Sequence, residues 1–151
     1  MLQAADFIGR WQIDRRIDDR HAGQTGTLAG TATFAPGGDG GLIYDERGTL
    51  RLGTGTPLEA TRRYLWRFGA GGVEVRFADG APFHAFVPAG RAAGTAHLCG
   101  ADLYEVAYDF SGFPEWQAVW TVRGPRKDYT ATTRHRRVSA TLAPDGAMGQ
   151  E

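Results

Sequence analysis

Apolar and polar residues alternate along most of the chain with a period of two, which indicates β-strands buried on one face. In the first such run, Trp11, Ile13 and Ile17 share one face with Arg15, whereas polar residues fill the alternate positions 12–18. No amphipathic helix of ten or more residues is predicted. The pattern predicts about ten strands, at residues 7–17, 26–35, 42–52, 58–68, 73–78, 82–88, 92–99, 103–110, 115–123 and 127–137.

Turn-forming residues separate these runs and indicate that most connections are short. Glycines follow Pro36 at 37–38 and 40–41, and Asp79-Gly80 is a strong hairpin signal. Closing such a meander into a barrel removes exposed strand edges, and a barrel of this size can hold one small ligand. We therefore expect an all-β, antiparallel up-and-down β-barrel over residues 1–138, with a two-sheet sandwich as the alternative. A flexible tail is expected over residues 139–151, where Ala, Pro, Gly and polar residues predominate.

Composition and charge exclude several classes of partner and site. The 17 basic and 17 acidic residues cancel, so the chain has no general attraction for nucleic acid or anionic membranes. The single cysteine, Cys99, excludes an intramolecular disulfide and the multi-cysteine zinc modules. The N-terminus lacks the basic flank and apolar stretch of a signal peptide, and no apolar run is long enough to span a membrane. We therefore expect a cytoplasmic protein.

The segment from Asp6 to Trp11 resembles the start of lipocalin-like (calycin) barrels, in which a Gly-x-Trp motif leads into the first strand. The resemblance implies structural roles for Gly9 and Trp11. Gly permits a tight backbone turn, and the indole covers the barrel floor. In lipocalins an Arg near the end of the last strand lies across that Trp. Arg134 and Arg136 are the two positions that match this role.

Three further stretches are similar to a bacterial family of uncharacterised single-domain proteins with a lipocalin-like fold. They are Arg62-x-Tyr64-x-Trp66, His97-x-Cys99-x-x-Asp102-x-Tyr104 and Trp120-Thr-Val-x-Gly-Pro-x-Lys127-Asp-Tyr129. The resemblance covers about residues 7–137 and implies a fold but no activity. Lipocalin barrels have eight strands. The ten strands predicted here make the fatty-acid-binding proteins and the haem-binding nitrobindins the nearer analogy.

Several charged residues share a strand face with apolar ones, most clearly Arg15, Glu46 and Arg62. An inward charge is costly unless it is paired or hydrated, and a ligand cavity removes that cost. The resemblance to fatty-acid-binding barrels, which place inward Arg and Tyr on a ligand carboxylate, implies the same use here. We expect the ligand site to include Arg15, Tyr44, Glu46, Arg62, Tyr64, Trp66, His97, Tyr104, Tyr108, Trp120, Lys127 and Tyr129.

Two alternatives to this site stay open. The charged residues face solvent if the strand phase is shifted by one, or Arg15 and Glu46 simply pair with each other. Glu46 and Asp102 are able to neutralise two of the inward cations, which leaves at least one cation for a ligand anion.

The densest reactive cluster runs from His97 to Tyr104. His97 and Cys99 share a face as two metal ligands would, but only Asp102 or His84 could complete the set, so no metal site is predicted. No cofactor is predicted either; for haem, His97 and His135 would be the candidate ligands. No catalytic residue is assigned. If the barrel were an enzyme, His97, Asp102 and Tyr104 would be the candidate acids and bases. The basic run at residues 134–137 is interpreted as a solvated rim.

These features favour a barrel that binds a small, partly apolar ligand with an anionic or hydroxyl end. One alternative is an isomerase- or cyclase-like enzyme on the same barrel, which a histidine or carboxylate with a perturbed pKa in the cavity would favour. The other is a protein-interaction module without a ligand, which a filled interior beside an exposed apolar patch would favour. The sequence indicates neither the ligand's identity nor the oligomeric state.

Overall fold

The computed structural model describes residues 1–138; the predicted tail at 139–151 lies outside the described residues. No helix among the described residues is long and apolar enough to cross a membrane. The elements are α1 (Ala4–Phe7), β1 (Gly9–Asp19), β2 (Gln24–Pro36), β3 (Leu42–Leu52), β4 (Leu58–Gly69), β5 (Gly72–Phe77), β6 (Pro82–Phe86), β7 (Arg91–Ala93), β8 (His97–Cys99), β9 (Asp102–Asp109), β10 (Trp116–Gly124) and β11 (Lys127–Arg137).

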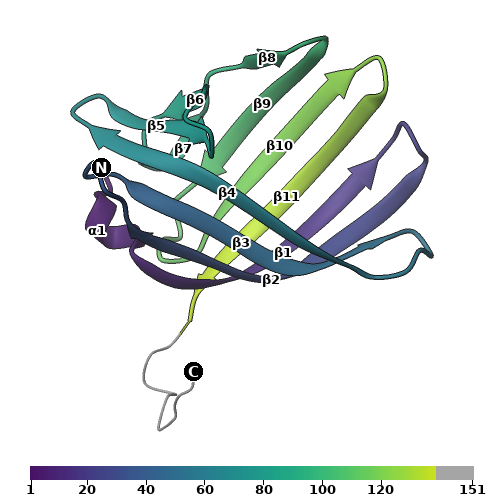
Figure 1. The fold of residues 1–151 in the computed structure, drawn as a ribbon, viewed down its shortest axis with the longest axis horizontal. Helices are drawn as coiled ribbons and strands as arrows, with labels where there is room; N and C mark the ends of the chain where they lie inside the picture. The colour runs from purple at the N-terminus through teal and green to yellow at the C-terminus, as the bar shows by residue number, and fades with distance from the viewer. Residues whose placement is uncertain (139–151) are drawn as a thin grey trace, which may run out of the picture.

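The strands form one antiparallel sheet that wraps into a nearly closed barrel (Figure 1). Their order is β6-β5-β4-β3-β2-β1-β11-β10-β9-β7, and β8 also pairs with β9. Pairing of β1 with β11 joins the two ends of the described chain, from Trp11 opposite Arg137 to Asp19 opposite Tyr129. The prediction of an all-β, up-and-down antiparallel barrel is confirmed.

The barrel closes at one end only. Thr95, which follows β7, connects that edge of the sheet to β6. Its N–H donates to the Ala85 carbonyl (2.9 Å), and its hydroxyl accepts from the Ala85 N–H (3.0 Å). On β4, β5 pairs only with residues 64–69, so residues 58–63 have no strand on that side within the described chain. The first half of β4 is therefore an unpaired edge of the sheet, and we call this edge the open side of the barrel (Figure 1).

The predicted run at residues 92–99 is two short strands rather than one. Between β7 and β8, the Gly94 N–H donates to the Val106 carbonyl (2.7 Å), and Thr95 then turns towards Ala85. A Cβ on Gly94 would lie 3.3 Å from that carbonyl oxygen and 3.1 Å from the His84 ring, so the bend leaves little room for a side chain. The segment breaks because it leaves β9 to close the barrel.

The closed end of the barrel is filled with aromatic rings. Phe7 and Trp11 are fully buried, and the Trp11 indole N–H donates to the Phe7 carbonyl (2.9 Å). Gly9 has φ +125°, a left-handed conformation that side chains rarely adopt, so the turn from α1 into β1 favours glycine there. Residues of the inner face that are at most 5 % exposed include Trp11, Phe34, Tyr44, Trp66, Val75 and Tyr108, whereas Trp120 is partly buried.

The arginine that lies across Trp11 is Arg137, so the expectation of Arg134 or Arg136 is wrong. The Arg137 guanidinium carbon is 4.0 Å from the centre of the Trp11 ring, and the side chain donates to the Ile8 carbonyl (2.7 Å). Strand periodicity explains the difference, because Arg137 shares the inner face with Ala131 and His135. Arg134 and Arg136 point outward, where they pair with Glu115 and Asp14.

Candidate functional site

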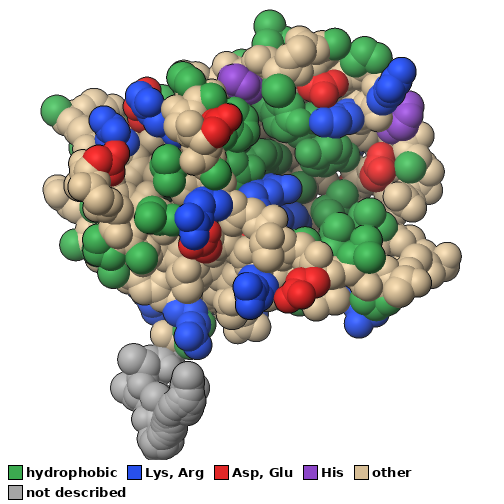
Figure 2. All heavy atoms as spheres, in the orientation of Figure 1, with side chains coloured by type: hydrophobic (Ala, Val, Ile, Leu, Met, Phe, Trp, Pro, Cys, Tyr) green, Lys and Arg blue, Asp and Glu red, His purple; other side chains and the backbone are tan. Residues whose placement is uncertain are grey.

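A cavity of about 250 Å³ lies inside the open end of the barrel, and we call it the mouth cavity. In the space-filling view, the visible face is hollowed, and hydrophobic and basic side chains line the hollow (Figure 2). Its polar inner end contains Arg15, Glu46 and Arg62, with Trp120 beside them. The other lining residues are Ile17, Asp19, Leu28, Leu50, Leu52, Ala60, Thr61, Tyr129 and Ala131. The cavity thus combines apolar walls with a charged inner end.

Arg15 and Glu46 form a buried ion pair at that inner end. Arg15 Nη2 donates to Glu46 Oε2 (2.6 Å), and Arg15 Nε donates to the Thr133 hydroxyl (2.6 Å). The Tyr44 hydroxyl donates to the same Glu46 oxygen (2.5 Å). Both charged side chains are less than a tenth exposed. Their hydrogen bonds hold them in one geometry, because each charge has a fixed partner.

The electrostatic balance keeps this pair ionised. Burial pushes the pKa of Glu46 upward, but the charges of Arg15 and Arg62 and the hydrogen bonds outweigh burial and bring the pKa below its usual range. Burial also disfavours the Arg15 charge, yet Glu46 brings the pKa of Arg15 above its ordinary value. The inner end therefore contains a carboxylate and a guanidinium, not a neutral acid.

Arg62 is the second cation at the inner end, and its side chain makes no ion pair or hydrogen bond with any residue from 1 to 138. It lies directly opposite Glu46 in the pairing of β3 with β4. Its guanidinium carbon is 5.5 Å from the centre of the Trp120 ring and 6.0 Å from that of Tyr64, within the range of a cation–π contact. Arg62 thus extends from β4 towards β10 across the open side of the barrel.

A second, much smaller space of about 30 Å³ lies deeper and shares Arg15, Glu46 and Trp120 with the mouth cavity; we call it the inner cavity. Two histidines line it. His84 Nε2 is 2.7 Å from the Tyr108 hydroxyl, and His135 Nε2 is 2.9 Å from the Tyr44 hydroxyl. The inner cavity has the volume of about one water molecule.

Both histidines are neutral near physiological pH. Burial lowers the pKa of His84 to about 4 and that of His135 to about 3. The single hydroxyl proton of Tyr44 is donated to Glu46, so His135 Nε2 carries the proton that bonds to the Tyr44 oxygen. His135 also stacks on Trp116, with ring centres 3.6 Å apart.

Comparison with known proteins gives a family and a structural neighbour. A family model described as a family of unknown function, DUF6314, matches residues 7–137. The chain belongs to this family. No curated protein matches it in sequence.

The structural neighbour is a Nostoc punctiforme protein described as of unknown function, from the DUF3598 family, with a TM-score of 0.64 and 14 % sequence identity. The match covers 91 % of this chain and 50 % of that protein, so the chain spans half the neighbour's length. At this identity the likeness shows the fold alone.

The residues predicted for the ligand site separate into three groups. Those that line the mouth cavity are Arg15, Glu46, Arg62, Trp120 and Tyr129. Those that line the inner cavity without reaching the mouth cavity are Tyr44, Tyr64, Trp66 and Tyr108. His97, Tyr104 and Lys127 line neither cavity.

Lys127 lies outside the cavities because it pairs with residues of β9. Its ammonium is 3.2 Å from an Asp102 carboxylate oxygen and donates to the Tyr104 hydroxyl (3.1 Å). These hydrogen bonds, first with Tyr104 and then with Asp102, raise the pKa of Lys127. The candidate acids and bases Asp102 and Tyr104 are therefore partners of a lysine, and His97 packs against Phe83 (ring centres 5.4 Å apart).

Neither a metal nor a haem fits the residues that the sequence singled out. No group of three or more His, Cys, Asp or Glu side chains gathers around a common point in residues 1–138. Cys99 is exposed, whereas His84 is buried against Tyr108. His135 adjoins a space far smaller than a porphyrin and is held between Trp116 and Tyr44.

The sequence prediction missed Thr133 and His135 as members of the polar network. The signal was present, because a period of two from Tyr129 along β11 places Ala131, Thr133 and His135 on one face. The sequence prediction assigned no ligand-site residue of this strand beyond Tyr129. The apolar wall residues, such as Leu28 and Leu50, lie within predicted strands but were not predicted to line a cavity.

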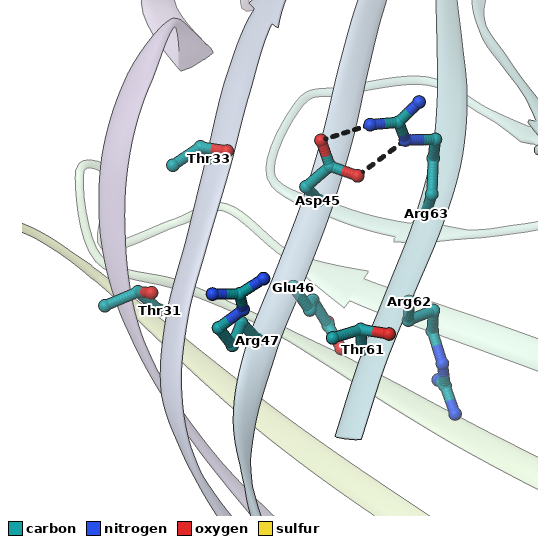
Figure 3. Close-up of a pocket in the computed structure, with 8 residues that line it drawn as sticks. All are labelled: Thr31, Thr33, Asp45, Glu46, Arg47, Thr61, Arg62 and Arg63. Atoms are coloured by element: carbon teal, nitrogen blue, oxygen red, sulfur yellow. Dashed lines mark hydrogen bonds and ion pairs between the residues drawn. The ribbon is translucent and has the colours of Figure 1, made fainter. Parts of the chain in front are cut away.

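A broader groove of about 620 Å³ lies on the outer face of β2, β3 and β4 (Figure 3). Asp45 and Arg63 form a two-point ion pair there (2.7 and 3.1 Å). In Figure 3, Glu46 and Arg62 extend to the other side of the same strands, into the barrel. The groove lacks apolar walls, so the mouth cavity is the better candidate for a ligand site.

Proposed function

We propose that this protein binds a small, partly apolar molecule in the mouth cavity and that an anionic or hydroxyl group of the ligand contacts the polar inner end. Apolar walls with a few convergent polar groups are the usual form of small-molecule sites. Ile17, Leu28 and Leu50 contribute apolar wall on three adjacent strands. The family and the structural neighbour have no assigned function, so the proposal rests on the cavity.

The observation that carries the proposal is Arg62. The other cation at the inner end, Arg15, is neutralised by Glu46, whereas Arg62 has no acidic partner in residues 1–138. It contacts Trp120, on the inner face of the barrel, and is exposed through the open side. Water hydrates the guanidinium until an anion replaces it, and a carboxylate or phosphate matches its planar set of donors.

The size of the cavity limits the ligand. At about 30 Å³ for each water molecule, a volume of 250 Å³ corresponds to about eight waters, which accommodates the polar end and much of the body of a compact aromatic acid. Aromatic packing fills the barrel beyond the inner cavity, which leaves no room for a long acyl chain. The ligand is therefore compact or extends out of the open side. The barrel therefore resembles fatty-acid-binding barrels only in having an internal polar site.

The alternatives receive less support. An enzyme would need an acid or base at the substrate, and the three predicted candidates, His97, Asp102 and Tyr104, line neither cavity. Among residues 1–138, the carboxyl and imidazole groups with a shifted pKa that do line a cavity are Glu46, His84 and His135, and each is hydrogen-bonded to a side chain of the barrel, Arg15, Tyr108 and Tyr44 respectively. A binding module without a ligand would have a filled interior, which the mouth cavity argues against. We retain the lipocalin-like relationship, a cytoplasmic location and the absence of a nucleic-acid partner as parts of the proposal, from sequence resemblance and composition.

The proposal is tested by equilibrium binding of phenylacetate, a compact aromatic carboxylate, measured by ligand-observed NMR. Ala60→Trp places an indole in the mouth cavity and is expected to abolish binding, because Ala60 lines it. Thr49→Trp adds the same side chain on the exposed outer face of β3 and is expected to leave binding unchanged. Equal binding to both variants would rule the site out, as would absence of binding of phenylacetate and of two related probes, mandelate and 1-phenylethanol.

A further inference from the structure

All hydrogen bonds that the Glu46 carboxylate accepts from residues 1–138 end on one of its two oxygens. Arg15 Nη2 and the Tyr44 hydroxyl both donate to Oε2, and Oε1 accepts none from residues 1–138. The buried, unpartnered side-chain atoms of the described chain are ring nitrogens of His84, Trp116 and His135. Since Glu46 Oε1 is unpartnered and not among them, it keeps accessible surface, and Glu46 lines both cavities.

This oxygen lies beside the cation that the proposed function assigns to the ligand's anion. Glu46 and Arg62 are direct partners in the β3–β4 pairing, and their side chains leave the same face of the sheet about 5 Å apart. The Arg62 charge acts on Glu46, where it lowers the pKa of the carboxyl group. A ligand group that contacts Arg62 is therefore within reach of the free carboxylate oxygen.

The net charge of the inner end determines which charge a ligand must have. Arg15 and Arg62 contribute two positive charges there and Glu46 one negative charge, which leaves one positive charge for a ligand anion. The other carboxylate of the cavity lining, Asp19, is the last residue of β1 and accepts from the Ala22 N–H of the turn (3.1 Å). A carboxylate alone would place its oxygens near Glu46 Oε1 with no proton between them, which is repulsive. A hydrogen-bond donor beside the ligand's carboxylate removes that repulsion and satisfies the oxygen.

We infer that the ligands of this site are compact carboxylates with a hydroxyl donor on the neighbouring carbon. The carboxylate binds Arg62, the donor binds Glu46 Oε1, and the apolar body lies on the wall that includes Leu28 and Leu50. This inference rests on the proposed function and adds the chemical class of the ligand. A simple monocarboxylate with a water molecule on Glu46 is the competing arrangement.

Three probes with one phenyl body separate these arrangements: mandelate, with both groups; phenylacetate, with the carboxylate only; and 1-phenylethanol, with the hydroxyl only. On the unmodified protein, mandelate in one enantiomer is expected to bind about tenfold or more tightly than either of the others, since each lost contact is a hydrogen bond to a charged group. Dissociation constants from ligand-observed NMR give this comparison without any variant.

Variants then assign each contact. Arg62→Met is expected to weaken mandelate and phenylacetate by about tenfold or more and to leave 1-phenylethanol unchanged. Arg47→Met removes a cation from the outer face of β3, next in sequence to Glu46, and is expected to change none of the three. Glu46→Gln is expected to reduce the preference for mandelate over phenylacetate to less than about threefold, because a neutral amide is a weaker acceptor.

The outcomes distinguish this inference from the function on which it rests. If none of the probes binds, both are wrong. If mandelate and phenylacetate bind equally well and Ala60→Trp abolishes both, the cavity binds carboxylates and the inference about a neighbouring donor is wrong. If 1-phenylethanol binds as tightly as mandelate, the assignment of the carboxylate to Arg62 is wrong. The comparison on the unmodified protein decides the matter even if Glu46→Gln does not fold.

Discussion

Acidification is expected to destabilise the barrel through its two buried histidines before most carboxylates titrate. His84 and His135 are 5 % and 2 % exposed, and each bonds to a tyrosine hydroxyl in the interior. In the unfolded chain their imidazoles have the ordinary pKa of 6.5, whereas in the folded protein the pKa is about 4 for His84 and about 3 for His135.

The direction of the change in stability follows from the number of protons that each state binds. Below pH 6.5 the unfolded state binds protons that the folded state does not, so the free energy of unfolding falls as the pH falls. From about pH 8 to about pH 5, each histidine removes about 2 kcal/mol, at about 1.4 kcal/mol per pH unit below 6.5. The two together remove about 4 kcal/mol, a large part of the 5–15 kcal/mol typical of a folded domain.

Urea unfolding followed by tryptophan fluorescence at the two pH values measures this loss. His135→Phe preserves a ring to stack on Trp116 and is expected to halve the loss, and adding His84→Phe is expected to remove most of it. His21→Gln removes an exposed histidine of the β1–β2 turn and serves as the control, with the loss unchanged. Equal stability of the unmodified protein at both pH values, or an undiminished loss in the double variant, would refute the reasoning.

Three further predictions concern stability in urea at neutral pH. Trp11→Ala is expected to cost about 3–5 kcal/mol, because a fully buried indole is removed from the closed end; an unchanged midpoint would contradict this role. Arg137→Ala is expected to cost about 1–2 kcal/mol through loss of its contact with Trp11, while Arg134→Ala, on the outer face, costs less than about 0.5 kcal/mol; equal costs would contradict the assignment. Arg15→Met is expected to cost about 3–5 kcal/mol by leaving Glu46 unpaired, and adding Glu46→Leu is expected to recover most of the loss; a double variant as unstable as the single would show that the pair does not account for it.

Alternation along the strands was sufficient to predict the strands and their inner faces, because a strand buried on one side must repeat with a period of two. The choice of a barrel over a sandwich came from the short connections and the removal of exposed strand edges. Trp11, Phe34 and Trp66 follow from this pattern without knowledge of the pairing. The same rule would have excluded Arg134 as the cover of Trp11 had the phase of the last strand been fixed first. That error came from an unassigned phase, not from missing information.

Contacts across the barrel had no comparable signal. Tyr44 and His135 are 91 positions apart, and their hydrogen bond depends on the register of the three strand pairs that connect β3 to β11 through β2 and β1. Lys127 shares its strand face with Tyr129, which made it a candidate for the cavity, but it is the first residue of β11 and reaches Asp102 on β9 instead. A residue of the inner face lines a cavity only where the aromatic packing ends. The alternation of apolar and polar residues in the sequence does not indicate where that is.

The central claim is that the mouth cavity binds a small carboxylate, and the tryptophan indole N–H signals test it most directly. In a ¹H–¹⁵N titration with phenylacetate, the Trp120 indole signal is expected to shift to saturation, because Trp120 lines the cavity beside Arg62. The Trp11 indole, bonded to the Phe7 carbonyl at the closed end, is expected to remain in place. A shift of Trp11 without Trp120, or no shift of Trp120 at saturating phenylacetate, would contradict the account.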